Sequence, residues 1–224
     1  DVDAWLRAPV FDLEEMEGEP CMIGLDLASR RDLAALVAVF RSEEKWRIWS
    51  RFWLPAARVR EVKTVPYQEW VDRGWIVETP GDIIDLDMIE DEIIDFASRF
   101  EIIEGAHDPF QATQLVTHLM DRGIKMVEVG QGFRTMSEPM KVLDALIRDG
   151  KVEHCGNGCM AWNIANVQAK FVQGSDHARP VKEREEEKID GAVAAIMAMN
   201  RWIAADAMPT SKPWWEQEDA SFVM

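Results

Sequence analysis

Blocks of hydrophobic and polar positions along the chain predict a mixed α/β domain. Near the start, Met22, Ile23 and Leu25 form an apolar run that ends at Asp26, which is typical of a buried strand followed by a turn. Gly24 within this run would let another backbone or a ligand come close. The apolar segments 33–40 and 45–54 flank the polar turn 41–44 and predict a hairpin. The sheet should therefore begin with antiparallel strands.

Beyond residue 55, helical and extended patterns alternate. The pattern predicts a short helix near Tyr67–Val71, strands at 75–78, 102–107, 124–129, 152–154 and 168–171, helices at 88–100, 111–122, 138–149, 161–167 and 188–204, and a charged loop at 174–186. Asp87 and Ser137 are the expected caps of the second and fourth helices. Such alternation favours parallel strands, so we expect a mixed sheet with helices on both faces.

Three segments follow from this pattern. Residues 1–20 lack a regular period and should form a linker that leads into the domain. Residues 21–204 should form the domain itself. Residues 205–224 contain two prolines, a Trp-Trp pair and several acids, which indicates an extended tail.

Composition favours a globular protein of a reducing compartment. The chain has 224 residues, of which 47% are hydrophobic, enough for a sizeable core. Its three cysteines are too few for a disulfide framework. No apolar run approaches the roughly 18 residues of a membrane span, and a signal-peptide pattern is missing. We therefore expect a cytoplasmic location and no membrane contact.

The net charge of −16 argues against a general nucleic-acid coat protein, because phosphate binding normally requires a basic surface. It does not exclude an enzyme that meets nucleic acid through metal ions, since cations held by carboxylates reverse the local field.

Three aspartates form the main candidate site. Asp26 and Asp108 each end a predicted strand, and Asp190 lies in the first turn of the last predicted helix. If the two strands are neighbours, the three carboxylates converge, and such like charges need compensation. Mg²⁺ or Mn²⁺ would supply it, and two such ions about 4 Å apart would clamp a phosphodiester for attack by water. The plain alternative is that Asp26 is a solvent-facing turn residue.

Several residues are secondary candidates. Lys182 would contact the scissile phosphate or balance the carboxylates, unless it is a solvated lysine. Asp32 and Glu187 are possible auxiliary ligands, but pairing with a nearby arginine and a solvated charge run are the structural alternatives. Gln131 follows a strand and would either touch DNA or cap a helix. Ser29 would hydrogen-bond its own turn.

A zinc site near residue 155 is a weaker hypothesis. His154, Cys155 and Cys159 offer only three ligands, whereas a structural zinc normally takes four. His107 precedes Asp108, and strand alternation would turn it away from the carboxylates as a packed residue rather than a general base.

Several segments resemble a known family. GLDLASRRDLAALV and HDPFQATQLVTHLMDRG resemble the first and second nuclease motifs of the large terminase subunit of tailed double-stranded DNA phages. The segments YQEWVDRGWIVETPGDIID, QGFRTMSEPMKVLDALIRDGKVEHCGNGCMAWNIANVQ and KIDGAVAAIMAM are similar to other parts of the same domain. They occur in the right order and cover most of residues 20–203.

This resemblance implies an RNase H-like fold and a metal-dependent endonuclease that cuts concatemeric DNA during genome packaging in the cytoplasm of the infected host cell. Asp26, Asp108 and Asp190 match the family's metal-binding carboxylates. The family also implies double-stranded DNA, an ATPase domain, the portal and the small terminase subunit as partners. The chain has no GxxxxGK[ST] phosphate loop, so we expect the nuclease domain alone and no ATPase activity.

Two other functions remain open on the sequence. A non-catalytic module would use the same fold to present an acidic surface and the Trp-rich tail to a portal or motor partner. A related RNase H-like resolvase or transposase would prefer branched or hybrid substrates to linear duplex DNA.

Overall fold

A computed structural model describes residues 1–27, 31–109 and 113–207. Its centre is a seven-stranded mixed sheet in the order β4-β3-β2-β1-β5-β6, with β7 also paired to β3. The strands are β1 (Pro20–Leu27), β2 (Ala34–Arg41), β3 (Trp46–Pro55), β4 (Ile76–Thr79), β5 (Glu101–His107), β6 (Met126–Glu128) and β7 (Val152–His154). Strands β1, β2 and β3 pair antiparallel, whereas β5, β6, β4 and β7 join in parallel. The expected mixed sheet, antiparallel first and then parallel, is confirmed.

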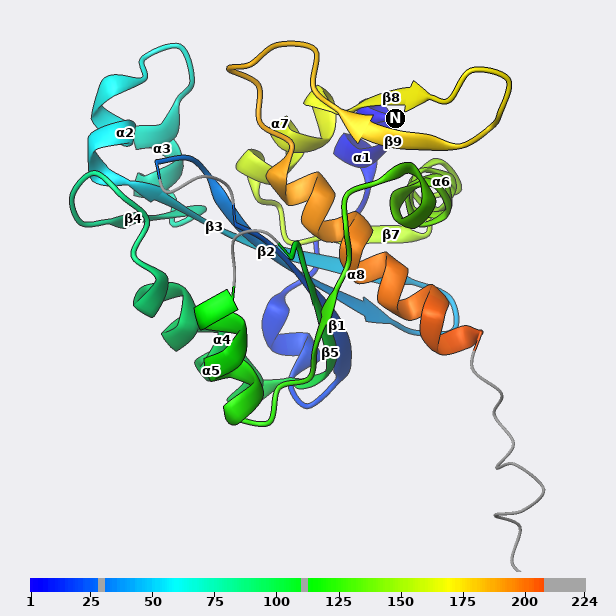
Figure 1. The fold of residues 1–224 in the computed structure, drawn as a ribbon, viewed down its shortest axis with the longest axis horizontal. Coiled ribbons are helices and arrows are strands. Elements are labelled where there is room, and N and C mark those ends of the chain that lie inside the picture. Colours follow the sequence, from blue (N-terminus) through cyan, green and yellow to red (C-terminus); the bar gives the residue numbers. More distant parts are fainter. Residues whose placement is uncertain (28–30, 110–112, 208–224) are drawn as a thin grey trace, which may run out of the picture.

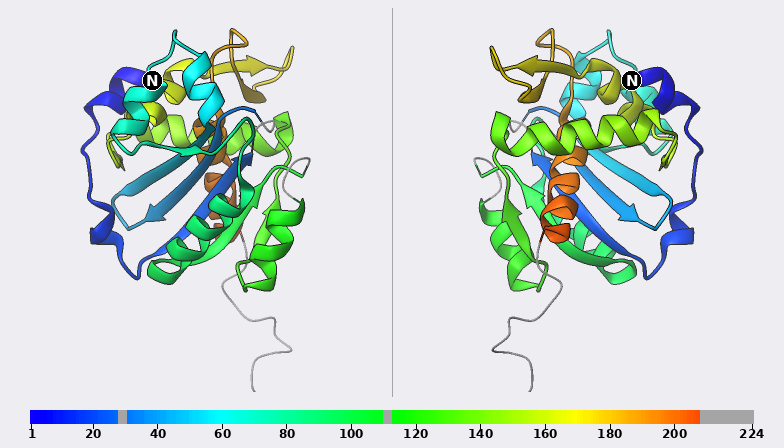
Figure 2. Two further views of the ribbon diagram at one scale, coloured as in Figure 1. Left: turned by 90° about the vertical axis from the view of Figure 1, so that its left-hand side faces the viewer. Right: turned by 90° about the vertical axis from the view of Figure 1, so that its right-hand side faces the viewer.

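Helices cover both faces of this sheet (Figure 1). They are α1 (Val2–Arg7), α2 (Ala56–Glu61), α3 (Tyr67–Asp72), α4 (Leu86–Arg99), α5 (Thr113–Asp121), α6 (Phe133–Arg148), α7 (Gly158–Asn166) and α8 (Asp190–Asp206). Helices α4 and α5 lie on one side, and α6, α7 and α8 lie on the other (Figure 2). None of the helices in the described ranges is long and apolar enough to cross a lipid bilayer.

Strand β2 shows why both faces of the sheet are covered by helices. Its side chains are buried along almost the whole strand, and they belong alternately to two hydrophobic cores. Val37 and Val39 pack in the core that contains α6, α7 and α8, whereas Leu36 and Phe40 pack in the core that contains α4 and α5. A strand buried on both faces reads as a continuous apolar run, which is what the sequence has here.

Helix α8 is the main element on its face of the sheet. Its residues from Gly191 to Met199 are all buried, and it packs against β1, β2 and β5. The small side chains of Ala194, Ala195 and Ala198 allow this close contact with the strands. The helix extends two residues beyond the expected boundary at residue 204.

The first twenty residues contain more regular structure than the sequence predicted. They form α1 and the 3₁₀ helix η1 (Leu13–Met16), and Trp5 of α1 is only 1% exposed. The Trp5 ring stacks on the His154 ring with 4.8 Å between centroids. A few side chains therefore fix this segment to the domain, although its apolar residues are too scattered to show a period.

Three other local predictions were wrong. Helix α4 is capped by Asp85, whose side chain accepts from two backbone N–H groups, and not by Asp87. Helix α6 begins at Phe133, so Ser137 lies inside it instead of capping it. The predicted loop 174–186 contains β9 (Ala178–Val181), which forms an antiparallel hairpin with β8 (Gln168–Phe171). Predictions for Ser29, for the start of the helix at Gln111 and for the tail beyond residue 207 fall outside the described residues.

Candidate functional site

The ends of β1 and β5 place two of the candidate carboxylates side by side. The strands are parallel neighbours, and Leu25 lies opposite His107 in their register. Asp26 is the next residue of β1, and Asp108 directly follows β5, so they reach the same edge of the sheet. The sequence alone could not show whether these two strands are neighbours. In the structure they are.

Helix α8 brings Asp190 to the same edge. Asp190 is the first residue of α8, and Gly24 of β1 lets the helix lie directly on the strand. Two asparagines of α7 hold the start of the helix: Asn163 Oδ1 accepts from the Gly191 N–H at 2.9 Å, and Asn166 Nδ2 donates to the Lys188 carbonyl at 3.0 Å. No pattern in the sequence indicates this anchoring, because it depends on where α7 packs.

All four predicted site residues line one cavity of about 510 Å³. Its wall is formed by the ends of β1 and β5, the turn after β6, strand β9 and the segment that leads into α8. The lining residues that carry a polar or charged side chain are Asp26, Asp32, Asp108, Gln131, Arg179, Lys182, Glu187, Lys188 and Asp190. Asp26, Asp108, Asp190 and Lys182 are thus gathered as predicted, although their chemical roles stay a prediction.

Burial and mutual repulsion raise the pKa of two of the carboxyl groups. For Asp26, burial is the main cause, and the negative charges of Asp190 and then Asp108 raise its pKa further. For Asp190, burial is the main cause and the negative charge of Asp32 adds to it, so that the pKa is raised to about 6, while Lys188 and Lys182 act in the opposite direction. A pair of buried carboxylates that repel each other is a place where a cation would be bound favourably.

Gln131 contacts the Asp26 carboxylate directly, which the sequence did not establish. Its Nε2 donates to Oδ1 of Asp26 at 3.1 Å. This hydrogen bond lowers the pKa of Asp26 against the larger effect of burial. Gln131 comes from the glycine-flanked turn after β6. The N-cap of the following helix α6 is Gly132 and no side chain of the described residues caps it, so the expected role of Gln131 as a helix cap is wrong.

Lysines and acids around the carboxylates are partly paired with one another. Lys188 is only 6% exposed and forms an ion pair with Asp32, so among the described residues this acid pairs with a lysine. Glu187 accepts from the backbone N–H groups of Glu183 and Arg184, which is a structural role. Lys182 is exposed, and its ammonium donates to the carbonyl of Glu185 at 2.8 Å.

The donor chemistry of this cavity suits a hard divalent cation. Asp26, Asp108 and Asp190 offer only oxygen atoms, the ligands preferred by Mg²⁺ and Mn²⁺. Within residues 1–27, 31–109 and 113–207, however, no three His, Cys, Asp or Glu side chains are grouped closely enough to form a metal site. The negative charge of Asp190 raises the pKa of Asp26 more than that of Asp108 does.

The residues of the weaker zinc hypothesis are engaged elsewhere. His154 Nδ1 accepts from the Gly156 N–H at 3.0 Å, so its Nε2 must donate to the Trp5 carbonyl at 3.1 Å. Both ring nitrogens are therefore used, and neither lone pair is available for a metal. His107 is buried at 5% exposure and does not line the carboxylate cavity.

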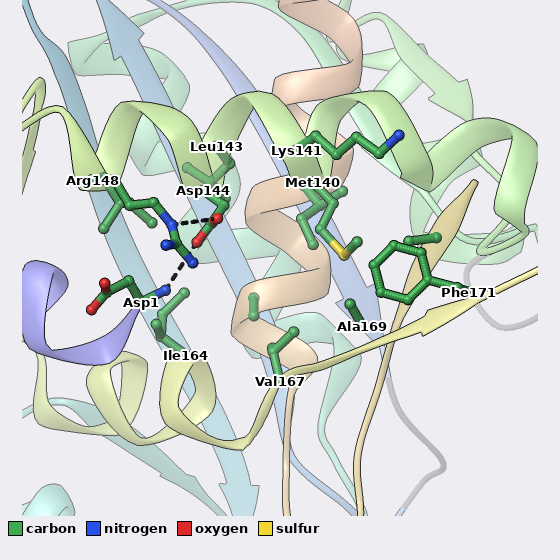
Figure 3. A pocket seen from close by; sticks show the side chains of 14 residues that line it. Asp1, Met140, Lys141, Leu143, Asp144, Arg148, Ile164, Val167, Ala169 and Phe171 are labelled. Carbon is green, nitrogen blue, oxygen red and sulfur yellow. Dashed lines mark hydrogen bonds and ion pairs between the residues drawn. The ribbon is translucent and has the colours of Figure 1, made fainter. Parts of the chain in front are cut away.

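A second cavity of about 330 Å³ is apolar and contains none of the predicted site residues. Figure 3 shows it between α6, α7 and β8, with the side chains of Met140 and Phe171 next to each other at one end. At its rim, Asp144 accepts from Arg148 and from the N-terminal amine of Asp1. Its lining offers no cluster of carboxylates for a metal.

Sequence comparisons identify relatives over almost the whole chain. The family model for the terminase large subunit, endonuclease domain, matches residues 1–206. Protein YmfN of Escherichia coli (strain K12) is 36% identical over 202 residues, which is 84% of this chain and 44% of YmfN. The large terminase subunit of Enterobacteria phage HK97 is 30% identical over 183 residues, which is 79% of this chain and 36% of that protein. The chain thus spans less than half the length of these relatives.

Solved structures share the fold. The HK97 bacteriophage large terminase matches with a TM-score of 0.77 and 24% identity, over 90% of this chain and 43% of that one. The large terminase nuclease of thermophilic phage G20c with bound magnesium matches with a TM-score of 0.53 and 9% identity, over 87% and 98%. The SPP1 nuclease domain with bound manganese matches with a TM-score of 0.50 and 15% identity, over 86% and 92%.

Proposed function

The chain belongs to the family of terminase large subunit endonuclease domains, and on that basis we propose that it is a divalent-metal-dependent endonuclease that cuts concatemeric double-stranded DNA during phage genome packaging. The observation that carries the proposal is the meeting of Asp26, Asp108 and Asp190 at one cavity. Two of these carboxyl groups have a raised pKa because they are buried and charged alike. Such an arrangement is unfavourable for folding alone and is expected where a cation is bound.

Asp26, Asp108 and Asp190 are the residues that would hold Mg²⁺ or Mn²⁺, and we propose two ions. Bound at such a site, the ions lower the pKa of a water molecule and stabilise the charge that develops on the phosphate. The magnesium and manganese bound to the nuclease domains of phages G20c and SPP1 support this choice of metal.

Other residues of the cavity prepare the carboxylates for this task. Gln131 fixes the Asp26 side chain by donating to one of its two oxygens, and it helps to keep the carboxyl group ionised. Asn163 and Asn166 hold the first turn of α8, so they fix the position of Asp190. Lys182 lies at the wall of the cavity, and we propose that its ammonium contacts the scissile phosphate.

The partners of the chain follow from the family and remain part of the proposal. Double-stranded DNA is the proposed substrate. A terminase ATPase domain, the portal and the small terminase subunit are the proposed assembly partners. The proposed place of action is the cytoplasm of the infected host cell, where concatemeric DNA is packaged.

DNA cleavage by the purified chain tests this function. Linear duplex and supercoiled plasmid are incubated with Mn²⁺ or Mg²⁺, with and without a chelator. We expect cleavage that the chelator abolishes, and loss of cleavage in Asp26→Asn with the fold intact. Asp91→Asn is the matched control, because Asp91 is an exposed acid of α4 on the opposite face of the sheet.

The same assay separates the two alternative functions. A chain that binds terminase partners but cuts no DNA under any metal condition would be a docking module. A chain that cuts branched DNA or an RNA–DNA hybrid in preference to linear duplex would be another RNase H-like nuclease. Equal cleavage by Asp26→Asn and the wild type would contradict the assignment of Asp26.

A further inference from the structure

Arg179 has an unusual environment for an arginine of this acidic chain. It lies in β9 and lines the cavity of Asp26, Asp108 and Asp190. Its Nε atom is buried and has no hydrogen-bond partner among the described residues. A buried donor without a partner costs free energy, so its retention at this position needs an explanation.

The position of Arg179 is fixed by its neighbours in α6. The guanidinium carbon lies 5.2 Å from the centre of the Phe133 ring, which is a cation–π contact. The preceding residue, Ala178, donates its backbone N–H to Oγ of Ser137 at 3.1 Å. Ser137 is buried inside α6, so this hydrogen bond ties β9 to the helix. Contacts with α6 thus hold Arg179 at two points: Ser137 fixes the adjacent backbone, and Phe133 packs against the guanidinium group.

The charges around Arg179 make its lack of an acidic partner informative. Five acids line the same cavity, yet no ion pair to Arg179 lies within 4.0 Å in the described part of the chain. By contrast, the half-buried Arg47 and Arg51 and the largely buried Arg201 each form an ion pair with a glutamate. An arginine that is placed but not paired keeps its donors available for an incoming anion.

We infer that Arg179 is a phosphate-binding residue that holds the DNA backbone beside the carboxylates. The inference rests on the proposed function, since it takes DNA as the ligand of this cavity. A guanidinium group presents a planar fork of donors that matches two phosphate oxygens. It also offsets the repulsion that a phosphate meets on approaching a wall of aspartates. Lys182 differs from Arg179, because Lys182 is exposed and its ammonium already donates to the Glu185 carbonyl.

DNA binding without cleavage tests this role. The affinity of the 224-residue chain for a fluorescent DNA duplex is measured by anisotropy, in Ca²⁺ and in chelator, at several salt concentrations. Arg179→Gln should weaken binding about tenfold, because a charge-assisted contact is lost. It should also reduce the slope of log K against log salt by about 1. Arg179→Lys should keep the salt slope but recover only part of the affinity, because it lacks the fork.

Lys170→Gln is the matched control. Lys170 lies directly opposite Arg179 in the β8–β9 hairpin, is exposed, and does not line the cavity. The Lys170→Gln substitution removes one positive charge from the same hairpin, as Arg179→Gln does. A loss of general electrostatic attraction would therefore affect both variants alike. Thermal melting of each variant shows whether the hairpin still folds, and if Arg179→Gln does not fold, the comparison of Arg179→Lys with Lys170→Gln decides.

Equal affinities and equal salt slopes for the Arg179 and Lys170 variants would overturn the role of Arg179. A wild-type chain that binds no DNA even at low salt would overturn it too. Failure of the proposed function has a different signature: the wild type would bind DNA through Arg179 yet leave it uncut in Mn²⁺ and Mg²⁺.

Discussion

Gly24 of β1 and Ala194 of α8 are in direct backbone contact, so close that a Cβ atom on Gly24 would lie 1.9 Å from the Ala194 carbonyl oxygen. The contact determines how near α8 lies to the sheet, and with it the distance from Asp190 to Asp26. The sequence predicted a close approach at Gly24 without identifying its partner. The fold of this face and the geometry of the carboxylates therefore depend on one missing side chain.

Gly24→Ala should destabilise the chain and separate the carboxylates. The added methyl group meets backbone atoms that have no space to move into, so we expect a loss of about 3 kcal/mol in the free energy of unfolding. Denaturant unfolding measures it. Gly130→Ala is the control, because nothing lies within 4 Å of the Cβ position there. Equal stability of the two variants would show that α8 does not need this contact.

Asp190→Asn should stabilise the metal-free chain at alkaline pH. Burial raises the pKa of Asp190 to about 6 from its ordinary 3.8, so the folded state binds this proton more tightly than the unfolded state does. The ionised group therefore costs stability above pH 6, and the cost vanishes below pH 3.8. We expect a gain of about 1–3 kcal/mol near pH 8 that shrinks toward pH 4.

Unfolding in urea with chelator, at several pH values, measures this gain for Asp190→Asn. Asp91→Asn serves as the exposed control and should change little at any pH. An Asp190→Asn variant that is less stable than the wild type across the whole range would mean that the carboxylate is satisfied within the fold.

Gln131→Ala should shift metal-dependent cleavage to higher pH. Its hydrogen bond to Oδ1 of Asp26 lowers the pKa of that carboxyl group, and metal binding needs the ionised form. Without the bond, a larger fraction of Asp26 is protonated near neutral pH. The pH profile of DNA cleavage in Mn²⁺ measures the shift. In Gln68→Ala, which removes a similar but exposed bond to Asp72, the profile should not move.

Glu104→Gln should loosen the far end of α8. Burial alone would raise the pKa of Glu104, but hydrogen bonds from Lys125 and Arg201 lower it below its usual 4.5. The ion pair therefore contributes stability above that pH, and the contribution is lost as the pH falls through the lowered value. At neutral pH we expect a loss of about 3 kcal/mol, because Arg201 is left buried and unpaired.

The control for Glu104→Gln is Glu92→Gln, which breaks a half-exposed pair with Arg51 and should cost less than about 1 kcal/mol. Thermal unfolding near pH 7 and again near pH 3 compares the two. A Glu104→Gln variant whose deficit persists unchanged in acid would contradict the electrostatic origin of the effect.

The sequence predicted the elements that carry a strong period and the residues at their ends. Asp26 and Asp108 could be placed because each follows a buried apolar run, and Asp190 because it lies in the first turn of a helix with an apolar face. Ser137 misled the prediction of α6, because serine is favoured at the N-cap of a helix. The burial of Met136 in the core instead extends the helix back to Phe133.

Contacts made by turns could not be predicted in the same way. Gln131 and Arg179 reach the cavity from a glycine-flanked turn and from a short hairpin, and neither segment has a hydrophobic period. Asn163 anchors α8 only because α7 packs beside it. Such residues carry no local signature, because their neighbours are distant in the sequence and are set by the packing of whole elements.

Crystals of the chain soaked in Mn²⁺ test the metal site most directly, because the anomalous signal of manganese locates the ions without reference to activity. We expect an anomalous peak between the carboxylates of Asp26, Asp108 and Asp190, and no peak there in crystals of Asp26→Asn. Manganese that binds only elsewhere, or that binds Asp26 while Asp190 contacts no ion, would contradict the proposed nuclease site.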